Sequence, residues 1–388
     1  MNSGKTVFSQ LMELVPYYRF CQCVERYQGH KWVQSFTCWE QFLALAFAQL
    51  TGRRSLRDIE ACLQAQRHKL YHMGFRSSVK RSTLAQANQN RNWRIWQDVA
   101  LGLIDIARPL YADEDLGLDL KQTAYALDST TIDLCLSLFP WAQHRQHKSA
   151  VKIHTLLDLA GSIPTFVEVT SGAVHDVNIL DHLFLPPGSY LVMDRGYIDF
   201  ARLYRLAQQA VYFVIRAKKN QQYRRLYSHP ADRYQGILCD QTIMMTGPKT
   251  SQFYPQQLRR VVYREVETSR SWTYLSNNFL LPARTVADLY RYRWQIELFF
   301  RWIKLHLKIK SFLGTSPNAV KTQIWTAIST YVLVAIAKKM LNLPQSLYTI
   351  LQILSVSVCE NVPILQVFSK NDYTFPSDDN PNQLYLFD

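Results

Sequence analysis

The chain has 388 residues, of which 48% are hydrophobic, 13% aromatic and 19% charged. This composition excludes a disordered or collagen-like protein, and the length allows one large domain or about two or three smaller ones. The 44 Lys and Arg residues outnumber the 30 Asp and Glu residues, so the formal net charge is +14. Such a positive field favours a polyanionic partner, although a basic soluble chain without one has the same composition.

The cysteine spacing and the hydropathy of the chain indicate the cellular compartment in which the protein is expected. The seven cysteines are scattered, without a Cys-x-x-Cys pair or a matching histidine spacing, so we expect reduced structural thiols and no zinc site. No charged segment followed by an apolar one opens the chain, and polar residues interrupt its most apolar run, 324–337. We expect a cytoplasmic, bacterial, nucleoid-associated protein that does not span a membrane, and without a P-loop we expect no use of ATP.

The N-terminal segment 1–112 has helical periodicity and carries 15 Lys and Arg against 7 Asp and Glu. Short basic helices joined by tight turns, as at 52–55 and 77–82, are typical of a helix-turn-helix reader of DNA. We therefore predict a helical DNA-binding domain over residues 1–112. A solvated helical bundle without a DNA partner is the alternative.

From residue 120 the periodicity becomes strand-like. Residues 120–220 predict the first part of an α/β core with the element order βββαβαβ. The expected strands are 124–134, 151–159, 165–170, 190–193 and 212–215, and the expected helices are 176–184 and 200–209.

The rest of the chain predicts three further segments. Short strand-like runs over 221–280 indicate a β-rich insertion, which interrupts the core before its last helix. That helix, in the segment 281–315, is expected to start at Thr285 and to run to about Lys310. Residues 316–388 are expected to form C-terminal helices and a polar tail.

The helix after Thr285 is predicted to have a cationic face that carries a single acid. At about 100° per residue, six residues project within a narrow arc, and the opposite face is apolar. A salt-bridged surface helix is the alternative, but ordinary surface helices mix both signs of charge. The pattern therefore favours a phosphate-binding face with one metal ligand in it. The six residues are Tyr290, Arg293, Glu297, Arg301, Lys304 and Lys308.

Two aspartates occupy unusual positions in the predicted strands. Asp128 lies in the middle of a strand, where burying a carboxylate is costly unless something compensates it. Asp194 ends an apolar strand, and the carboxyl ends of strands are where open α/β sheets bind ligands. Each alone is more often a cap or turn residue. With Glu297, they form a set of three carboxylates suited to Mg²⁺ or Mn²⁺, and two such ions assist attack on a phosphodiester.

These residues resemble a known signature. The spacing Tyr-x2-Arg-x3-Glu-x6-Lys at positions 290–304 resembles that of the insertion-sequence family four transposases, DDE enzymes with a ribonuclease-H-like catalytic core. Asp128 in Leu-Asp-Ser-Thr and Asp194 in Asp-Arg-Gly-Tyr fall where that family has its first and second acids. A β-rich insertion before the glutamate helix is also typical of the family. The resemblance covers about residues 120–315.

The resemblance implies a role for each matching residue. Asp128, Asp194 and Glu297 are the expected catalytic residues and the ligands of two Mg²⁺ or Mn²⁺ ions. Trp272 is a candidate to stack on a flipped base, and a tryptophan in the core is the alternative. The remaining residues are expected to contact DNA phosphates: Tyr290, Arg293, Lys304, Arg301, Lys308, Arg216 and Lys218. Such contacts position a duplex without reading its sequence.

Three further residues are weaker candidates. Asp176 follows His175 at the start of a predicted helix, where an N-cap is its simplest role. Lys152 and His154 alternate on a predicted strand and are expected to contact the DNA backbone.

The predicted function is that of a DNA transposase. We expect it to bind terminal inverted repeats of double-stranded DNA, to cleave the element ends by metal-dependent hydrolysis and to join the 3′-hydroxyl ends to target DNA. Action on paired ends makes a homodimer the expected state in the DNA complex. Two alternatives stay open: a catalytically inactive DNA-binding protein descended from a transposase, and a ribonuclease-H-like nuclease without strand transfer.

Overall fold

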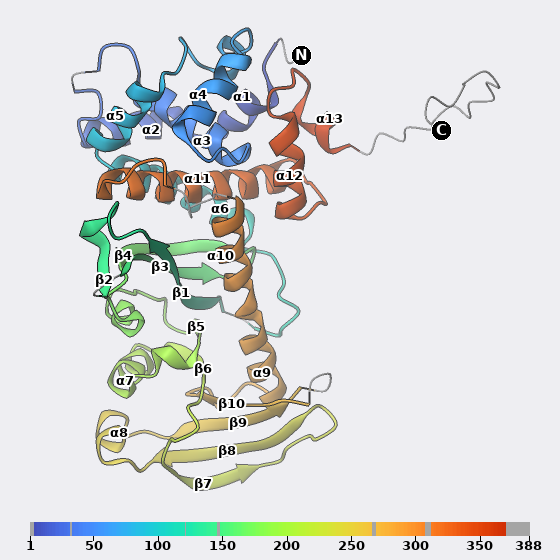
Figure 1. Cartoon of the computed structure of the whole chain (residues 1–388). Coiled ribbons are helices and arrows are strands. Elements are labelled where there is room, and N and C mark those ends of the chain that lie inside the picture. Colours follow the sequence, from blue (N-terminus) through green and yellow to red (C-terminus); the bar gives the residue numbers. More distant parts are fainter. Residues whose placement is uncertain are drawn as a thin grey trace, which may run out of the picture.

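Three tiers follow one another along the long axis of the molecule (Figure 1): a helical tier, the core of a mixed sheet, and the continuation of that sheet by the insertion. This computed structural model describes residues 4–31, 33–120, 122–145, 148–265, 269–306 and 312–369. Both ends of the described chain lie in the helical tier, because α1 packs against α13.

The N-terminal segment is helical, as the sequence predicts. Thr37 and Glu40 form a capping box at the start of α3, and Ser55 accepts a hydrogen bond from the first turn of α4. The helices are α1 (Val7–Met12), α2 (Tyr17–Arg26), α3 (Cys38–Leu50), α4 (Leu56–Ala65), α5 (Arg81–Asn90) and α6 (Arg94–Leu110), with the 3₁₀ helix η1 (Tyr71–Met73) between α4 and α5.

The long helix α11 (Pro317–Met340) runs between the N-terminal helices and the sheet (Figure 1). It packs against α3, α6 and α12 (Leu347–Ser357), and every residue from Thr322 to Ala337 is buried. It is long and apolar enough to cross a membrane, but 94% of its most apolar window is buried inside the protein, as in the core helix of a globular fold. The C-terminal helices α11, α12 and α13 (Ile364–Phe368) thus share one core with the N-terminal helices.

The core of the sheet has the strand order β4-β3-β1-β5-β6. The strands β1, β3 and β4 form an antiparallel meander, whereas β5 is parallel to β1 and β6 is parallel to β5. β5 is buried along its whole length, as is typical of a parallel strand covered on both faces. The elements are β1 (Ala124–Leu134), β2 (Gln143–Arg145), β3 (Lys148–Asp158), β4 (Ile163–Ser171), β5 (Tyr190–Met193), α7 (Phe200–Gln208) and β6 (Tyr212–Arg216), with the 3₁₀ helices η2 (Pro140–Ala142), η3 (Asp176–Asp181) and η4 (Arg195–Tyr197).

The insertion continues the same sheet, because its last strand pairs antiparallel with β6. The order beyond β6 is β10-β9-β8-β7, which places β7 at the far edge. A buried ion pair, Arg259 Nη2 to Asp240 Oδ2 at 2.7 Å, joins β9 to β8, and Arg259 also donates to the carbonyl of Leu281 ahead of the next helix. The elements are β7 (Tyr223–His229), β8 (Ile237–Met245), α8 (Pro248–Phe253), β9 (Leu258–Arg264) and β10 (Ser271–Ser276).

Two predicted core helices differ from the structure. The segment expected to be a helix at 176–184 is instead the short 3₁₀ helix η3. It ends at Asp181, whose carboxylate pairs with Arg202 and Arg205 of α7. The helix expected from Thr285 to about Lys310 starts earlier and is divided into α9 (Ala283–Tyr292) and α10 (Trp294–His306).

The division lies at Arg293. The Arg293 N–H donates to the carbonyl of Tyr290, and the Ile296 N–H donates to the carbonyl of Arg293. Both hydrogen bonds link residues three apart, as in a 3₁₀ helix, and not four apart as in an α-helix. The predicted apolar face still packs as expected, because Leu289, Ile296 and Phe299 are buried. Figure 1 shows α10 and α9 running along one side of the sheet from the helical tier to the insertion.

Candidate active site

The structure brings Asp128 and Asp194 to neighbouring positions on two parallel strands. The parallel register of β1 and β5 ends with the pair Leu127 and Met193, so the two aspartates are the next residues of their strands. Asp194 lies just beyond the carboxyl end of β5, where open α/β sheets place ligand sites. Strand pairing therefore makes adjacent two acids that are 66 residues apart in sequence.

The Asp128 carboxylate is largely buried and has two partners. Its Oδ1 atom accepts from the Ser129 N–H at 2.8 Å, and its Oδ2 atom lies 2.8 Å from Nη1 of Arg293. The pKa of Asp128 is raised to about 6, chiefly by burial and also by the charges of Asp194 and Glu297, against the lowering effects of the Ser129 N–H and of Arg293. The pKa shift thus has one cause in burial and another in the convergence of three acids.

A glycine lets the Asp194 side chain turn back on its own backbone. Its Oδ1 atom accepts from the Gly196 N–H at 2.7 Å, which caps the 3₁₀ helix η4. A Cβ atom at residue 196 would lie 2.9 Å from that same oxygen. The Asp-Arg-Gly sequence therefore has a physical basis, because any larger residue at 196 would displace the carboxylate.

Arg293 connects the first acid to the third. Its Nη1 atom pairs with Asp128, and its Nη2 atom pairs with Glu297 one helical turn further along. Its side chain is 16% exposed, and its Nε atom is buried without a hydrogen-bond partner among the described residues. A single guanidinium thus pairs with two of the three carboxylates, so the cluster keeps a formal negative charge.

The donor chemistry of the three acids fits a divalent ion. Carboxylate oxygens are the ligands that Mg²⁺ and Mn²⁺ prefer, and the net negative charge of the cluster would attract a cation. Over the ranges that the structure describes, however, no three acidic, histidine or cysteine side chains are arranged to hold one ion. The position between Asp128 and Glu297 is taken by the Arg293 guanidinium.

A cavity of about 580 Å³ adjoins Glu297 and Arg293. The Tyr274 and Tyr290 rings pack at 4.7 Å between centroids, and the Arg216 guanidinium lies 4.1 Å from the centre of the Trp272 ring. We name this the aromatic cavity after the rings that line it: Tyr263, Trp272, Tyr274, Tyr290 and Trp294.

The other residues expected to bind DNA are more dispersed. Arg301 is exposed, and its guanidinium lies 5.8 Å from the centre of the Trp294 ring. Lys304 is partly buried, whereas Lys218 is exposed and lines a neighbouring cavity together with Arg216. Lys308 lies outside the described residues.

Asp176 has more contacts near Asp128 than the N-cap role predicted from the sequence. Asp176 is the first residue of η3, and its side chain is no cap. Its Oδ1 atom accepts from the Ser129 hydroxyl at 2.8 Å and lies 3.2 Å from Nζ of Lys152. Only the His175-Asp176 pair marked it, and nothing local shows that β1 and β3 bring Ser129 and Lys152 to it.

The expectation that His154 contacts DNA is wrong. Its side chain is fully buried, its Nε2 atom shares a hydrogen bond with the Thr170 hydroxyl, and burial lowers its pKa to about 4. Strand alternation identified His154 correctly as a neighbour of Lys152 on one face, but Thr170 of β4 and Asp176 of η3 lie against its ring.

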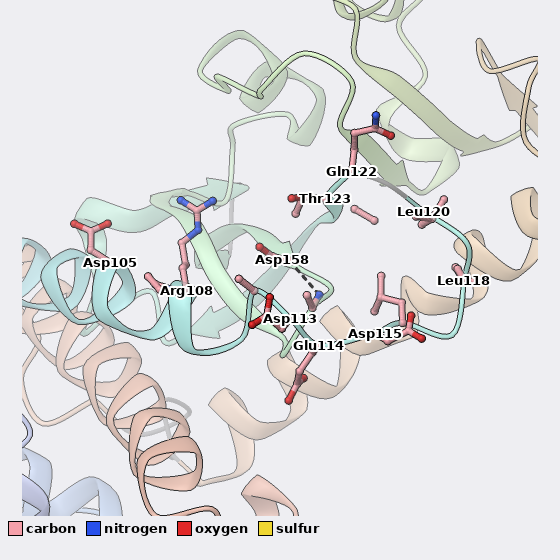
Figure 2. A pocket seen from close by; sticks show the side chains of 15 residues that line it. Asp105, Arg108, Asp113, Glu114, Asp115, Leu118, Leu120, Gln122, Thr123 and Asp158 are labelled. Atoms are coloured by element: carbon pink, nitrogen blue, oxygen red, sulfur yellow. Dashed lines mark hydrogen bonds between the residues drawn. The ribbon is translucent and has the colours of Figure 1, made fainter.

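A second large cavity, of about 550 Å³, lies where the chain enters β1 (Figure 2). Figure 2 shows Arg108 of α6 and Asp158 of β3 among the side chains that line it. We name it the acidic cavity after five of its lining residues: Asp105, Asp113, Glu114, Asp115 and Asp158. None of the three expected catalytic acids lines it.

Sequence comparison places the chain in a family. The model of the transposase DDE domain matches residues 119–333, more than half of the chain, and the protein belongs to that family. A second model, of a domain of unknown function, matches residues 3–76.

Three relatives are named as transposases. The chain is 33% identical over 219 residues to a protein of Sinorhizobium fredii and 32% identical over 209 residues to the transposase of an insertion sequence element of Geobacillus stearothermophilus. These matches cover 55% and 53% of this chain, but only 60% and 54% of the relatives. A third relative, from an insertion sequence element of Synechocystis, is 23% identical over 296 residues, which cover 74% of this chain and 80% of the relative.

Among solved structures, a piggyBac transposase synaptic complex with hairpin DNA aligns with 91% of this chain and 78% of its own, at 11% identity and a TM-score of 0.44. A likeness at this score supports no conclusion about site or function.

Proposed function

We propose that the protein is the transposase of an insertion sequence of family four, with a ribonuclease-H-like core. The strand order β4-β3-β1-β5-β6, with three antiparallel strands followed by two parallel ones, supports that core. The observation that carries the proposal is the meeting of Asp128, Asp194 and Glu297 from β1, the end of β5 and α10. A surface salt bridge needs no such convergence of acids.

The proposed reaction is cleavage of the element ends, followed by transfer of the 3′-hydroxyl ends to target DNA. Asp128, Asp194 and Glu297 would hold two Mg²⁺ or Mn²⁺ ions, which when bound activate the attacking oxygen and stabilise the leaving one. Hydrolysis and strand transfer are both in-line substitutions at phosphorus, so one set of residues serves both steps. The Ser129 N–H and the Gly196 N–H hold the two aspartates in place.

The Arg293 guanidinium can bind either the site carboxylates or a DNA phosphate. Without DNA it pairs with Asp128 and Glu297. A DNA phosphate competes for the same guanidinium, because arginine binds phosphate and carboxylate with similar geometry. When Arg293 turns to the phosphate, the two carboxylates become free to act together. Phosphate binding by Arg293 and assembly of the three acids are therefore coupled in this proposal.

The remaining contacts follow from position. Tyr290 and Trp272 line the aromatic cavity beside Glu297, and Trp272 would stack there on an unpaired base. The cations on and near α10 and at the end of β6 would contact the DNA backbone: Arg301, Lys304, Lys308, Arg216 and Lys218. The helices of residues 1–112 would bind the inverted repeats, and a homodimer would hold the two ends together.

The test compares acids that are inside and outside the proposed site. Asp128→Asn, Asp194→Asn and Glu297→Gln should each reduce cleavage of element ends by at least about a thousandfold, because each removes a ligand charge. DNA binding in a gel-shift assay should persist, and EDTA should stop cleavage until Mg²⁺ is restored. Asp158→Asn, in the acidic cavity, is the matched control and should cleave normally.

Strand transfer by any of the three site variants at the wild-type rate would contradict the proposal. Binding of element ends by the wild-type chain without Mg²⁺-dependent cleavage would support an inactive DNA-binding descendant. Cleavage without joining would instead support a nuclease.

A further inference from the structure

A third cavity, of about 300 Å³, is lined by five cations and no acid. We name it the cation cavity. Its volume is at the lower end of those that hold small ligands. The five cations are Arg195, Arg216, Lys218, Lys219 and Arg260.

Four separate elements bring these cations together. Arg195 begins η4 directly after Asp194, and Arg216 ends β6. Lys218 and Lys219 follow in the turn after β6, and Arg260 projects from β9 of the insertion. The cluster exists only because β10 joins the insertion to β6, and no stretch of sequence contains it.

The cations have no acidic partner among the described residues. Arg195, Lys218 and Lys219 are exposed and form no ion pair. Arg260 donates to the Gln241 side-chain oxygen at 3.0 Å and to Cys239 Sγ at 3.1 Å, both of which are neutral acceptors. Like charges held around one cavity repel one another, so an anion that enters it relieves this cost.

A neutral donor on the cavity wall also lacks an acceptor. The Gln221 side-chain nitrogen is buried and has no hydrogen-bond partner within the described part of the chain. A buried donor without an acceptor costs free energy. The cavity therefore offers charge and an unmatched N–H group to the same ligand oxygens.

The cation cavity adjoins the candidate active site through a shared wall. Arg216 and Trp272 line both this cavity and the aromatic cavity, with the guanidinium 4.1 Å from the ring centre. On its other side Arg195 follows Asp194 in the chain. An anion in the cavity thus lies against the ring on which a base would stack and against the residue that follows the second acid in the chain.

We propose that the cation cavity binds a phosphate group of the DNA strand that passes from the catalytic acids to Trp272. This inference rests on the proposed function and adds to it a defined anchor, formed by Arg195, Lys219 and Arg260 with Arg216 and Lys218. The phosphate is either an internal phosphodiester or the 5′-phosphate of a cleaved strand. Both present the same oxygens to the five cations.

The test measures binding of a labelled single-stranded oligonucleotide against salt concentration. The double variant Arg195→Gln/Lys219→Gln changes two exposed side chains without ion pairs, so folding should be unaffected. Its slope of log K against log salt should be smaller by about 1.4, because each single-strand phosphate contact contributes about 0.7. Affinity at low salt should fall about tenfold, since charge-assisted hydrogen bonds are lost.

The matched control is Arg233→Gln/Lys249→Gln, which removes one exposed arginine and one exposed lysine of the insertion outside this cavity. Its slope should equal that of the wild type. Equal slopes for the cavity variant and the wild type would overturn the inference. Inorganic phosphate should raise the melting temperature of the wild type above that in chloride of equal ionic strength, and a rise of the same size in the cavity variant would also overturn it.

Two oligonucleotides distinguish the two sources of phosphate. If the 5′-phosphate binds, the wild type should prefer a 5′-phosphorylated strand to a 5′-hydroxyl strand, and the cavity variant should lose the preference. If an internal phosphodiester binds, both strands should weaken equally in the variant. A wild-type chain that binds DNA with the expected slope but does not cleave it would overturn the proposed function and still support this cavity.

Discussion

Two buried aspartates on paired strands have similar pKa values but different neighbouring charges. Asp128 of β1 and Asp158 of β3 lie three positions apart along the antiparallel register, and burial raises the pKa of each to about 6. Asp128 has two acids and a bridging guanidinium around it. Asp158 accepts from the Ala160 N–H at 3.0 Å, feels the charge of Arg108 at longer range and forms no ion pair with a described residue.

This difference shows what identifies a candidate site. A raised carboxyl pKa reports burial, and both residues have one. Only Asp128 lies where β1, β5 and α10 each contribute an acid. The aromatic cavity and the acidic cavity differ in the same way. Four arginines and five aromatic rings line the aromatic cavity together with three acids, whereas five acids and a single arginine line the acidic cavity. The charges of the lining residues and the convergence of three acids distinguish the Asp128 region from the Asp158 region more clearly than burial or cavity volume does.

The largest effect on stability is expected at Arg293. Arg293→Gln leaves Asp128 and Glu297 close together without their cation, which should reduce the free energy of unfolding by about 2 kcal/mol in metal-free buffer. Added Mg²⁺ should stabilise this variant more than the wild type, because the position between the carboxylates is then open. Urea unfolding followed by tryptophan fluorescence measures both quantities.

The control for that comparison is Arg291→Gln, in the last turn of α9 and two residues before Arg293. Arg291 is 67% exposed and pairs with Asp288 at 3.4 Å, so its loss should change stability by less than about 0.5 kcal/mol. If Arg293→Gln were no less stable than Arg291→Gln, Arg293 would not be the counter-ion of the acids.

The second effect concerns Asp158 and has a definite pH dependence. The folded chain holds the Asp158 proton more tightly than the unfolded chain does, so this group favours folding below about pH 4. That contribution is lost as pH rises to about 6, above which the charged carboxylate opposes folding.

Asp158→Asn removes the charge and keeps an oxygen for the Ala160 N–H. It should therefore raise the free energy of unfolding by about 1 to 2 kcal/mol at pH 7.5 and have little effect near pH 4. Denaturation curves of both proteins across this range measure the difference. An equal gain at both pH values would show that the charge of Asp158 is not the cause.

The smallest effect is expected at the ring shared by two cavities. Trp272→Ala should weaken binding of single-stranded DNA by about 1 kcal/mol, or about fivefold, because one stacking surface is lost. Trp272→Phe should retain most of the affinity. Fluorescence anisotropy with a labelled oligonucleotide gives the values, and Trp141→Ala, a partly exposed tryptophan outside both cavities, is the control. Equal losses at Trp272 and Trp141 would remove the stacking role.

Much of the fold could be predicted from local patterns. The first strand, Ala124–Leu134, and the fourth, Tyr190–Met193, are where alternation and an apolar run place them. The glutamate helix was predicted with the correct buried face, but its division at Arg293 was not. That division comes from hydrogen bonds and ion pairs to residues that helical periodicity does not contain.

The sequence by itself predicted most strands and helices and singled out the three acids as candidates, because strand and helix periods and the Asp-Arg-Gly turn are properties of neighbouring residues. Only the tertiary structure decided that Arg293 lies between Asp128 and Glu297, that Asp176 joins Ser129, and that His154 is buried. It also decided that five cations from four elements surround one cavity. These arrangements depend on strand order and on long-range pairing, which bring together side chains that no local pattern connects.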